Sequence, residues 1–457
     1  MHWRFVLAGS AALSSFIGGP ALAQDASQSG AATDKPPSIQ SSLGPFGDPG
    51  GWRAAAEARG LTINLSYTNE MLGNLSGGLR RHGVYAGKLE AQLGIDLGTM
   101  AGWQGLAFFA NAFQIHDTGG LRDRTFGRLV TVSNIEAYPS TRLSEIWLEQ
   151  KWAGDRFGLR IGQITADGEF FSADYGRIFL SNDWPTITGA NLPAGGPAYP
   201  ISTPGIRFRA QPTDSLTALF AIFNGDPGDQ KEVNRDGLRF PLRDPALLMG
   251  EVQYRYGQDK ESTGLAGTWR LGGYHRLGRF DDLRYDRTGL ALLHPTSNGE
   301  PRRLRGMSGL YGVVDHQLWR PEGGSHEDGI LVYGRLSASP SDRSHIDLWA
   351  DGGLVFSGLV PRRPHDQFGV SFIYSRIGRA LRSADRDAQI HAGAFAPIRS
   401  YEATFEATYA AQIAPGWVVQ PDIQYVYRPA GGVENPYRPG TLLKGGFIVG
   451  LRSTLTY

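Results

Sequence analysis

Apolar and polar side chains alternate along most of this chain after about residue 60. In the segment 85–97, Leu89 and Leu93 share one face, whereas Lys88 and Glu90 share the other. Successive side chains of a β-strand point to opposite sides, so the pattern predicts a strand with one apolar and one polar face. Sixteen segments share this alternating pattern, and most are close in length to a tilted membrane strand, which has about 9–11 residues. The segments are 61–67, 85–97, 106–115, 143–152, 157–163, 206–210, 216–223, 248–256, 265–275, 310–318, 330–336, 346–356, 368–374, 401–412, 417–427 and 447–457.

The length and the margins of these segments distinguish a membrane barrel from a soluble β-sandwich. Sandwich strands are typically about 5–6 residues long, which is shorter than most of the segments. Aromatic residues stand at the margins, as in the interfacial girdles of membrane barrels, and the chain ends on Tyr457 with Leu455 and Leu451 on the same parity. Closure would leave no unpaired strand edge. The sequence therefore predicts an all-β fold, a transmembrane antiparallel β-barrel of sixteen strands with a short N-terminal helix and an inward-folded loop.

The first residues have the features of a secretory signal peptide. Arg4 precedes an apolar run, and Ala21, Leu22 and Ala23 form a small-residue cleavage pattern. Gly and Ser interrupt the run, which is shorter than the about 20 residues of a spanning helix, so a membrane anchor is disfavoured. We expect a signal peptide at 1–23, a flexible N-terminal arm at 24–50 and an outer-membrane β-barrel domain at 51–457 that starts with a helix at 52–59.

Composition excludes several other classes of protein. Lys+Arg is 45 and Asp+Glu is 44, whereas nucleic-acid binders carry a basic excess. The chain has no cysteine, and its 10 histidines have no metal-ligand spacing, so we expect no disulfide, metal site or cofactor. Lysine supplies only six of the cations; the remaining arginines suit planar, forked recognition of a ligand.

Four stretches of the chain have a distinctive sequence in a fixed order. The most specific is Trp417–Gly432, WVVQPDIQYVYRPAGG. It is preceded by Arg160–Asn182 (RIGQITADGEFFSADYGRIFLSN), Tyr199–Arg207 (YPISTPGIR) and Phe223–Asp226 (FNGD). The chain resembles the carbohydrate-selective outer-membrane porins of the OprB family in these stretches, and the resemblance extends over roughly residues 52–457. It implies a sixteen-stranded barrel in the outer membrane of a Gram-negative bacterium, through which glucose and related sugars pass by facilitated diffusion.

Parity assigns the side chains that face the lumen of the predicted barrel. A sugar offers hydroxyls, which guanidiniums and carboxylates bind, and a C–H patch, which an indole covers. Such a site must bind weakly enough to release its solute. We therefore expect a sugar-selective constriction, with two tryptophans facing water and the arginines opposite the first tryptophan and its flanking acids. The alternative is that these charges only hydrate a wide channel. The candidate substrate-binding residues are Glu145, Trp147, Glu149, Arg160, Arg207, Arg209, Trp349 and Asp351.

The connection 165–204 is far longer than the others. A loop of this length in a compact domain is usually functional. We predict that it folds into the lumen rather than forming an exposed lid. Its aromatic residues would pack on the wall: Phe170, Phe171, Tyr175, Phe179, Trp184 and Tyr199. Its charged residues would narrow the passage: Asp167, Glu169, Asp174, Arg177 and Asp183. The segments 227–245 and 279–305 are expected to be polar outer loops.

Three other functions stay open. The arginines motivate a general or anion-selective diffusion porin, and a structural or adhesive barrel is a second alternative. An outer-membrane hydrolase is the third, but its imaginable carboxylate pair, Glu402 and Glu406, lies about 13 Å apart along one strand, too far for a glycosidase. We therefore expect no enzyme. The expected partners are neutral sugars, outer-membrane lipid and lipopolysaccharide, with no nucleic acid, and the family resemblance favours a monomer over a trimer.

Overall fold

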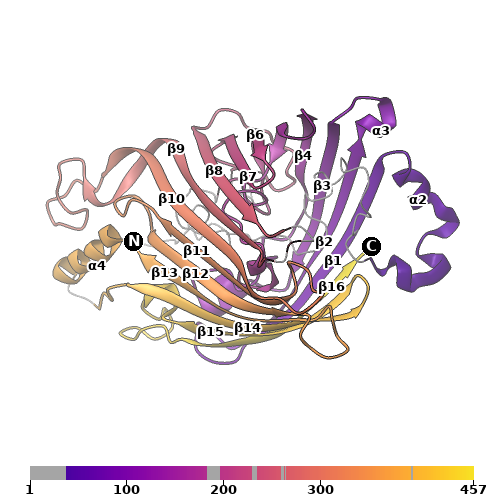
Figure 1. The fold of residues 1–457 in the computed structure, drawn as a ribbon. Coiled ribbons are helices and arrows are strands. Elements are labelled where there is room, and N and C mark those ends of the chain that lie inside the picture. Colours follow the sequence, from indigo (N-terminus) through magenta and orange to yellow (C-terminus); the bar gives the residue numbers. More distant parts are fainter. Residues whose placement is uncertain (1–37, 183–195, 229–233, 259–261, 263, 393–394) are drawn as a thin grey trace.

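The structure is a computed structural model that describes residues 38–182, 196–228, 234–258, 262, 264–392 and 395–457. All sixteen predicted strands form, and they close into one barrel in which β1 is hydrogen-bonded to both β2 and β16 (Figure 1). The strands are β1 Leu61–Asn74, β2 Gly83–Asp96, β3 Leu106–Asp117, β4 Ser140–Trp152, β5 Phe157–Ile164, β6 Thr203–Thr213, β7 Leu216–Asn224, β8 Ala246–Tyr256, β9 Gly267–Asp286, β10 Pro301–Trp319, β11 Gly329–Ala338, β12 Ile346–Ser357, β13 Gln367–Ile377, β14 Tyr401–Ala414, β15 Trp417–Tyr427 and β16 Gly446–Thr456. The predicted antiparallel barrel is confirmed, because both closing pairs, like the others, are antiparallel.

Short helical segments accompany the strands. They are η1 Ile39–Phe46, η2 Pro49–Gly51, α2 Trp52–Glu57, α3 Leu97–Ala101, η3 Leu121–Phe126, η4 Tyr175–Ile178, α4 Arg379–Ala392 and η6 Pro429–Gly431. The predicted N-terminal helix corresponds to α2, where the Arg53 guanidinium donates to Ile63 O at 2.9 Å. Tyr457 Oη donates to Gly47 O at 2.6 Å, so the segment before α2 packs against the end of the chain. The predicted signal peptide, 1–23, and the arm up to residue 37 lie outside the described residues.

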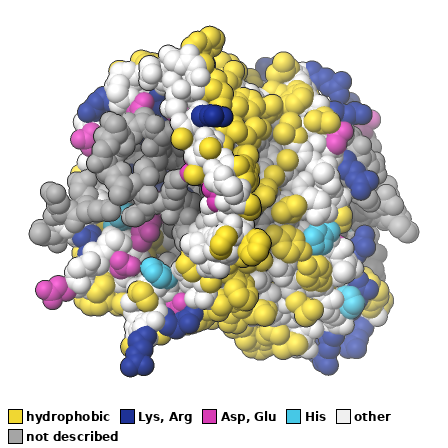
Figure 2. Space-filling model, turned by 90° about the vertical axis from the view of Figure 1, so that its right-hand side faces the viewer, with side chains coloured by type: hydrophobic (Ala, Val, Ile, Leu, Met, Phe, Trp, Pro, Cys, Tyr) yellow, Lys and Arg dark blue, Asp and Glu magenta, His cyan; other side chains and the backbone are white. Residues whose placement is uncertain are grey.

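The two faces of the wall separate apolar from polar side chains as the alternation requires. On β2, Lys88 and Glu90 are buried inside the barrel and form an ion pair at 2.9 Å, whereas Leu89 between them is exposed. Leu271 on β9 and Leu310 on β10 are each 72% exposed on the outside. In the space-filling view, hydrophobic side chains gather in a broad band, and Lys and Arg lie mainly at its margins (Figure 2). Among the described residues, no helix combines the length and hydropathy needed to cross a bilayer.

The connections at the two ends of the barrel differ in length. The end at which β1 finishes carries the long connections, including 118–139, 165–202 and 378–400, whereas the opposite end has turns as short as 214–215. Outer-membrane barrels have short periplasmic turns and longer extracellular loops, so the first end is extracellular.

One prediction for the extracellular loops is wrong. About half of 279–305 is strand rather than loop, because β9 continues to Asp286 and β10 begins at Pro301, so that only 287–300 connects them. Cross-strand ion pairs, such as Arg302 to Asp282 at 2.6 Å, stabilise this extension beyond the wall.

Candidate functional site

Wall carboxylates hold the backbone of the long inward loop, which we define as residues 165–202. Glu251 on β8, Asp315 on β10 and Glu406 on β14 each accept hydrogen bonds from main-chain N–H groups of this loop. The bonds are Phe171 N to Glu251 at 2.8 Å, Asp174 N and Tyr175 N to Asp315 at 3.0 Å each, Leu180 N to Glu406 at 2.6 Å and Ser181 N to Glu406 at 3.0 Å. The described part of the loop therefore runs inside the barrel along the wall from β8 to β14, and the predicted inward fold is confirmed.

Aromatic side chains of this loop pack on the inner wall, also as predicted. The Phe171 ring stacks on Tyr311 with centroids 4.2 Å apart, and Phe179 lies 5.8 Å from Tyr333. Both phenylalanines are buried. Each of these contacts bridges loop and wall, so apolar burial adds to the backbone bonds in holding the loop inside. The predicted contributions of Trp184 and Asp183 lie outside the described residues.

A second inward loop, residues 118–139, was not predicted. Glu402 on β14 accepts hydrogen bonds from Leu129 N at 2.8 Å and Val130 N at 3.1 Å. The fully buried Arg128 lies 3.6 Å from Glu402 and donates to Gln424 on β15 at 3.0 Å. Because burial removes the solvation of its charge, the pKa of Arg128 is lowered. Apolar residues spaced through this connection were the signal that it is not an exposed loop.

Four charged residues form a compact group on one side of the lumen, which we call the charge cluster: Glu149 on β4, Arg160 on β5, Arg207 on β6 and Glu169 on the long inward loop. Glu149 lies 2.9 Å from both Arg160 and Arg207. Glu169 lies 2.6 Å from Arg207 and 3.4 Å from Arg160. Two cations thus alternate with two anions, and the formal charge of the cluster is zero.

Trp147 and Glu145 support this cluster from β4. The Arg160 guanidinium lies 3.8 Å from the centroid of the Trp147 ring, and Phe109 stacks on the same indole at 4.9 Å. Glu145 accepts a hydrogen bond from Thr165 N at 3.0 Å, at the start of the long inward loop. Trp147 is only 2% exposed, so the expectation that its indole faces water is wrong. Arg160 and its neighbours cover it, and the indole fixes the guanidinium instead.

The structure places the predicted arginines beside Trp147, not across the lumen from it. β4, β5 and β6 are consecutive in the barrel, and Arg160 pairs directly with Glu149 and with Arg207. Arg209 lies two residues further along β6, towards the periplasm, and donates to Asp155 O at 3.1 Å. Sequence parity gives the face of a side chain but not its distance around the wall.

Trp349 and Asp351 belong to a separate group on β12. Asp351 accepts hydrogen bonds from Arg335 on β11 at 2.7 Å and from the Trp349 indole at 3.0 Å. Arg335 also donates to Asn182 of the long inward loop at 2.5 Å. Trp349 is 2% exposed and packs with Val130 of the second inward loop, so it does not face water either.

Acidic residues of the long inward loop have opposite pKa shifts. Burial raises the pKa of the Asp167 carboxyl to about 6, although this group accepts a hydrogen bond from Tyr199 N at 2.8 Å. Burial would also raise the pKa of Glu169, but the Arg207 and Arg160 guanidiniums outweigh it, so the pKa of Glu169 is lowered. The pKa of Asp174 is lowered in the same way, with Arg270 outweighing burial. Glu169 and Asp174 therefore remain charged at neutral pH.

Part of this arrangement is open to solvent. The side chains of Glu169, Asp174 and Arg177 are 17%, 28% and 30% exposed, whereas that of Arg207 is 2% exposed. The long inward loop thus presents charged groups to water while wall arginines bind them from behind. Such groups can exchange hydrogen bonds with the hydroxyls of a passing solute. Among the described residues, no group of three or more His, Cys, Asp or Glu could hold a metal ion.

Comparisons with known proteins agree on the family and the fold. The family model for the carbohydrate-selective porin, OprB family, matches residues 80–457. Porin B of Pseudomonas aeruginosa is 22% identical over 410 residues, which cover 84% of this chain and 87% of that protein. The putative porin QuiX of Acinetobacter baylyi is 18% identical over 408 residues, covering 84% and 88% of the two chains. The high-pH structure of Pseudomonas putida OprB superposes with a TM-score of 0.79 at 20% identity, covering 90% of this chain and 97% of that one.

Proposed function

Because the chain belongs to the OprB family of carbohydrate-selective porins, an outer-membrane channel family, we propose that its barrel lets glucose and related neutral sugars diffuse passively across the outer membrane. The finer proposal is that sugars are selected where the long inward loop meets β4, β5 and β6. The candidate residues there are Glu145, Trp147, Glu149, Arg160, Arg207 and Glu169.

The charge cluster is the observation that carries this proposal. Its two guanidiniums and two carboxylates lie 2.6–3.4 Å from one another, and its formal charge is zero. A neutral but strongly polar passage offers hydrogen bonds to hydroxyls without attracting either sign of ion. We assign Trp147 a positioning role, because its indole lies under Arg160 and is not open to a solute.

Swelling of proteoliposomes tests the proposal. Glucose should enter faster than a solute of equal size without hydroxyls. R160A should reduce that preference, since it removes a member of the cluster and the cover of Trp147. R156A is the matched control, because Arg156 lies at a periplasmic turn with a side chain 47% exposed. Equal rates for glucose and the size-matched solute would leave only a general pore. A preference that survives R160A would move the selecting site elsewhere.

Anion-selective diffusion is the second candidate function, and two cations favour it. Arg255 on β8 faces inward and is exposed, and Arg209 lies on the inner face of β6. Among the described residues, neither guanidinium has a carboxylate within ion-pair distance. Reversal potentials in a salt gradient separate the two functions, because strong anion selectivity without a preference for sugars would favour this alternative.

A further inference from the structure

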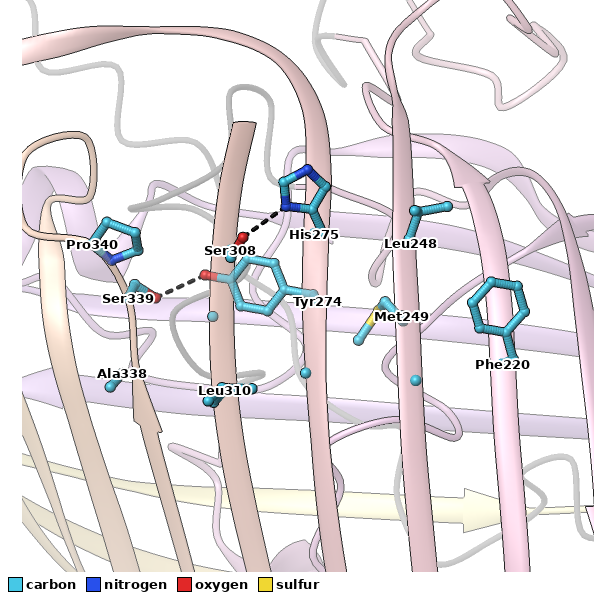
Figure 3. Close-up of a pocket in the computed structure, with 13 residues that line it drawn as sticks. Phe220, Leu248, Met249, Tyr274, His275, Ser308, Leu310, Ala338, Ser339 and Pro340 are labelled. Carbon is cyan, nitrogen blue, oxygen red and sulfur yellow. Dashed lines mark hydrogen bonds between the residues drawn. The ribbon is translucent and has the colours of Figure 1, made fainter. Parts of the chain in front are cut away.

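A groove crosses the outer face of the barrel near its extracellular end, from β7 to β11 (Figure 3). Its volume is about 510 Å³. Gly250 on β8 and Gly273 on β9 are directly paired and form its floor, because neither has a side chain to fill the space. The groove includes Ala338, the last residue of β11 at the extracellular end, and this shows how high the groove lies on the wall. Larger apolar side chains border it: Phe220, Leu248, Leu310 and Pro340.

The groove faces the lipid, and its apolar lining suits an acyl chain. Leu271, Gly273, His275 and Leu277 follow the outward parity of β9, whereas Tyr274 between them is buried inside. Two polar pairs border the groove: His275 Nδ1 and Ser308 Oγ are 2.7 Å apart, and Tyr274 Oη and Ser339 Oγ are 2.8 Å apart (Figure 3).

Two arginines lie above the groove on the same outward face. Arg279 on β9 and Arg305 on β10 are directly opposite each other, and both are exposed. Within the described part of the chain, neither guanidinium has a hydrogen bond or an ion pair. Like charges directly opposite each other on a sheet are destabilising unless an anion lies between them. Neighbouring Arg303 differs, because Asp281 lies 2.8 Å from it.

The geometry of β10 aims Arg305 outward. Gly306 has a φ of +65°, and a bulge at this point shifts the register between Arg305 and Met307. Arg343 stabilises the bulge by donating to Arg305 O at 2.8 Å and to Gly306 O at 2.6 Å. Without the bulge, strict alternation after the buried Met307 would turn Arg305 inward. The unusual backbone conformation at Gly306 thus places two like charges side by side on the outer face.

The height of the arginines above the groove matches one leaflet. Gly273 and Arg279 are six residues apart along β9, about 20 Å of extended strand, and the strand tilt of about 35–45° reduces this to a height of about 15 Å. The hydrocarbon part of one leaflet is about 15 Å thick, half of a core of about 30 Å. A lipid with its phosphate at the arginines would therefore extend its acyl chain into the groove.

We propose that this face is a binding site for one lipopolysaccharide molecule of the outer leaflet, with a lipid A phosphate between Arg279 and Arg305 and an acyl chain over Gly250 and Gly273. The site depends on the outer-membrane location of the barrel but not on which solute passes through it. A phosphate accepts charge-assisted hydrogen bonds from both guanidiniums and removes their repulsion.

Native mass spectrometry of the full-length porin in detergent, titrated with bis-phosphorylated lipid A, tests the site. R279S/R305S should weaken lipid A binding about tenfold or more, since each cation near a charged lipid surface contributes about a factor of five. R235S/R438S is the matched control, because it removes two exposed arginines of other extracellular loops. G250L should also weaken binding by filling the groove. A Cβ at Gly250 meets nothing closer than Leu219 O at 4.0 Å, so the wall tolerates it.

Controls separate this site from any other lipid effect. G312L adds the same side chain to the same face, where the nearest atom to a Cβ is Arg270 O at 3.8 Å, but outside the groove. It should bind lipid A like the wild type. Equal affinity of R279S/R305S and the wild type would overturn the proposal, as would equal affinity for dephosphorylated lipid A or for phosphatidylglycerol. Glucose-driven swelling should be unchanged in all four variants, so failure of the lipid site and failure of the sugar function are distinguishable.

Discussion

Replacing Glu169 with glutamine should convert the neutral charge cluster into a cationic one. Arg160 and Arg207 balance Glu149 and Glu169 in the structure, so E169Q leaves one net positive charge. An ion that passes about 8 Å from this charge would gain or lose about 0.5 kcal/mol in water, and about 2 kcal/mol at an effective dielectric constant of 20. The charge favours an anion and disfavours a cation by the same energy, so the anion-to-cation permeability ratio changes by twice this energy. It should therefore rise by about fivefold or more, since each 1.4 kcal/mol is a factor of about ten.

The same substitution should loosen the long inward loop. Glu169 accepts two hydrogen bonds from Arg207, both at 2.6 Å, and hydrogen bonds to charged groups stabilise by about 1.5–3 kcal/mol each. Arg207 keeps Glu149 at 2.9 Å, so the guanidinium is not left unpaired. Single-channel conductance should rise, because the loop is held less firmly near the wall.

Planar bilayer recordings measure both effects. The reversal potential in a KCl gradient gives the permeability ratio, and the unitary current gives the conductance. E300Q is the matched control, because Glu300 pairs with Arg287 on an outer loop and its side chain is 59% exposed. A folded E169Q porin with the reversal potential of the wild type would refute the placement of the charge cluster on the ion path.

Two other predictions concern the inward loops. R128M should destabilise the second inward loop by about 3–5 kcal/mol, because Glu402 would lose its buried partner. New protease cleavage within 118–139 in intact vesicles measures this loss. R124M is the control and should stay resistant to the protease, because Arg124 is an exposed arginine of the same loop. Resistance of R128M would show that the backbone bonds to Glu402 suffice. The pKa of Asp167 is raised to about 6 in the folded chain, so its contribution to stability is present at low pH and lost as the pH rises through about 6. Acidification from pH 7 to 5 should therefore stabilise the fold around Asp167 by about 1 kcal/mol, because the buried carboxyl loses its charge, even though the Tyr199 N–H bonds the charged form better. We expect about fivefold slower hydrogen exchange in 196–202 after correction for intrinsic rates, and D167N should abolish the effect.

The strands and their faces could be predicted because both follow from a local property. Alternation with period two fixes which side of a strand each residue takes, so Lys88, Glu149 and Asp351 could be assigned to the lumen. The same rule predicted the sixteen strands, since each hydrophobic band must span the same membrane. The inward fold of the long loop followed from its length and its aromatic residues.

The partners of the lumenal side chains could not be predicted, because the contacts that decide them are remote in sequence. The alternation predicts that Glu406 is a lumenal carboxylate but names no partner for it, and in the structure it accepts a hydrogen bond from Leu180 N, 226 residues away. Glu402 binds the backbone of the second inward loop, in which Arg128 is fully buried. Alternation also could not show that the wall tryptophans are covered, because the covering groups belong to other strands and to the loops.

Sequence alone thus determined a closed wall, apolar outside and polar inside, because hydrophobic periodicity needs only neighbours in the chain. Tertiary structure decided which charges anchor loops and which face water, because every buried N–H must find an acceptor and the nearest one lies on a distant strand. The tertiary structure also decided where two paired glycines form a groove on the outer face, because a groove depends on the side chains of adjacent strands and not on one strand alone.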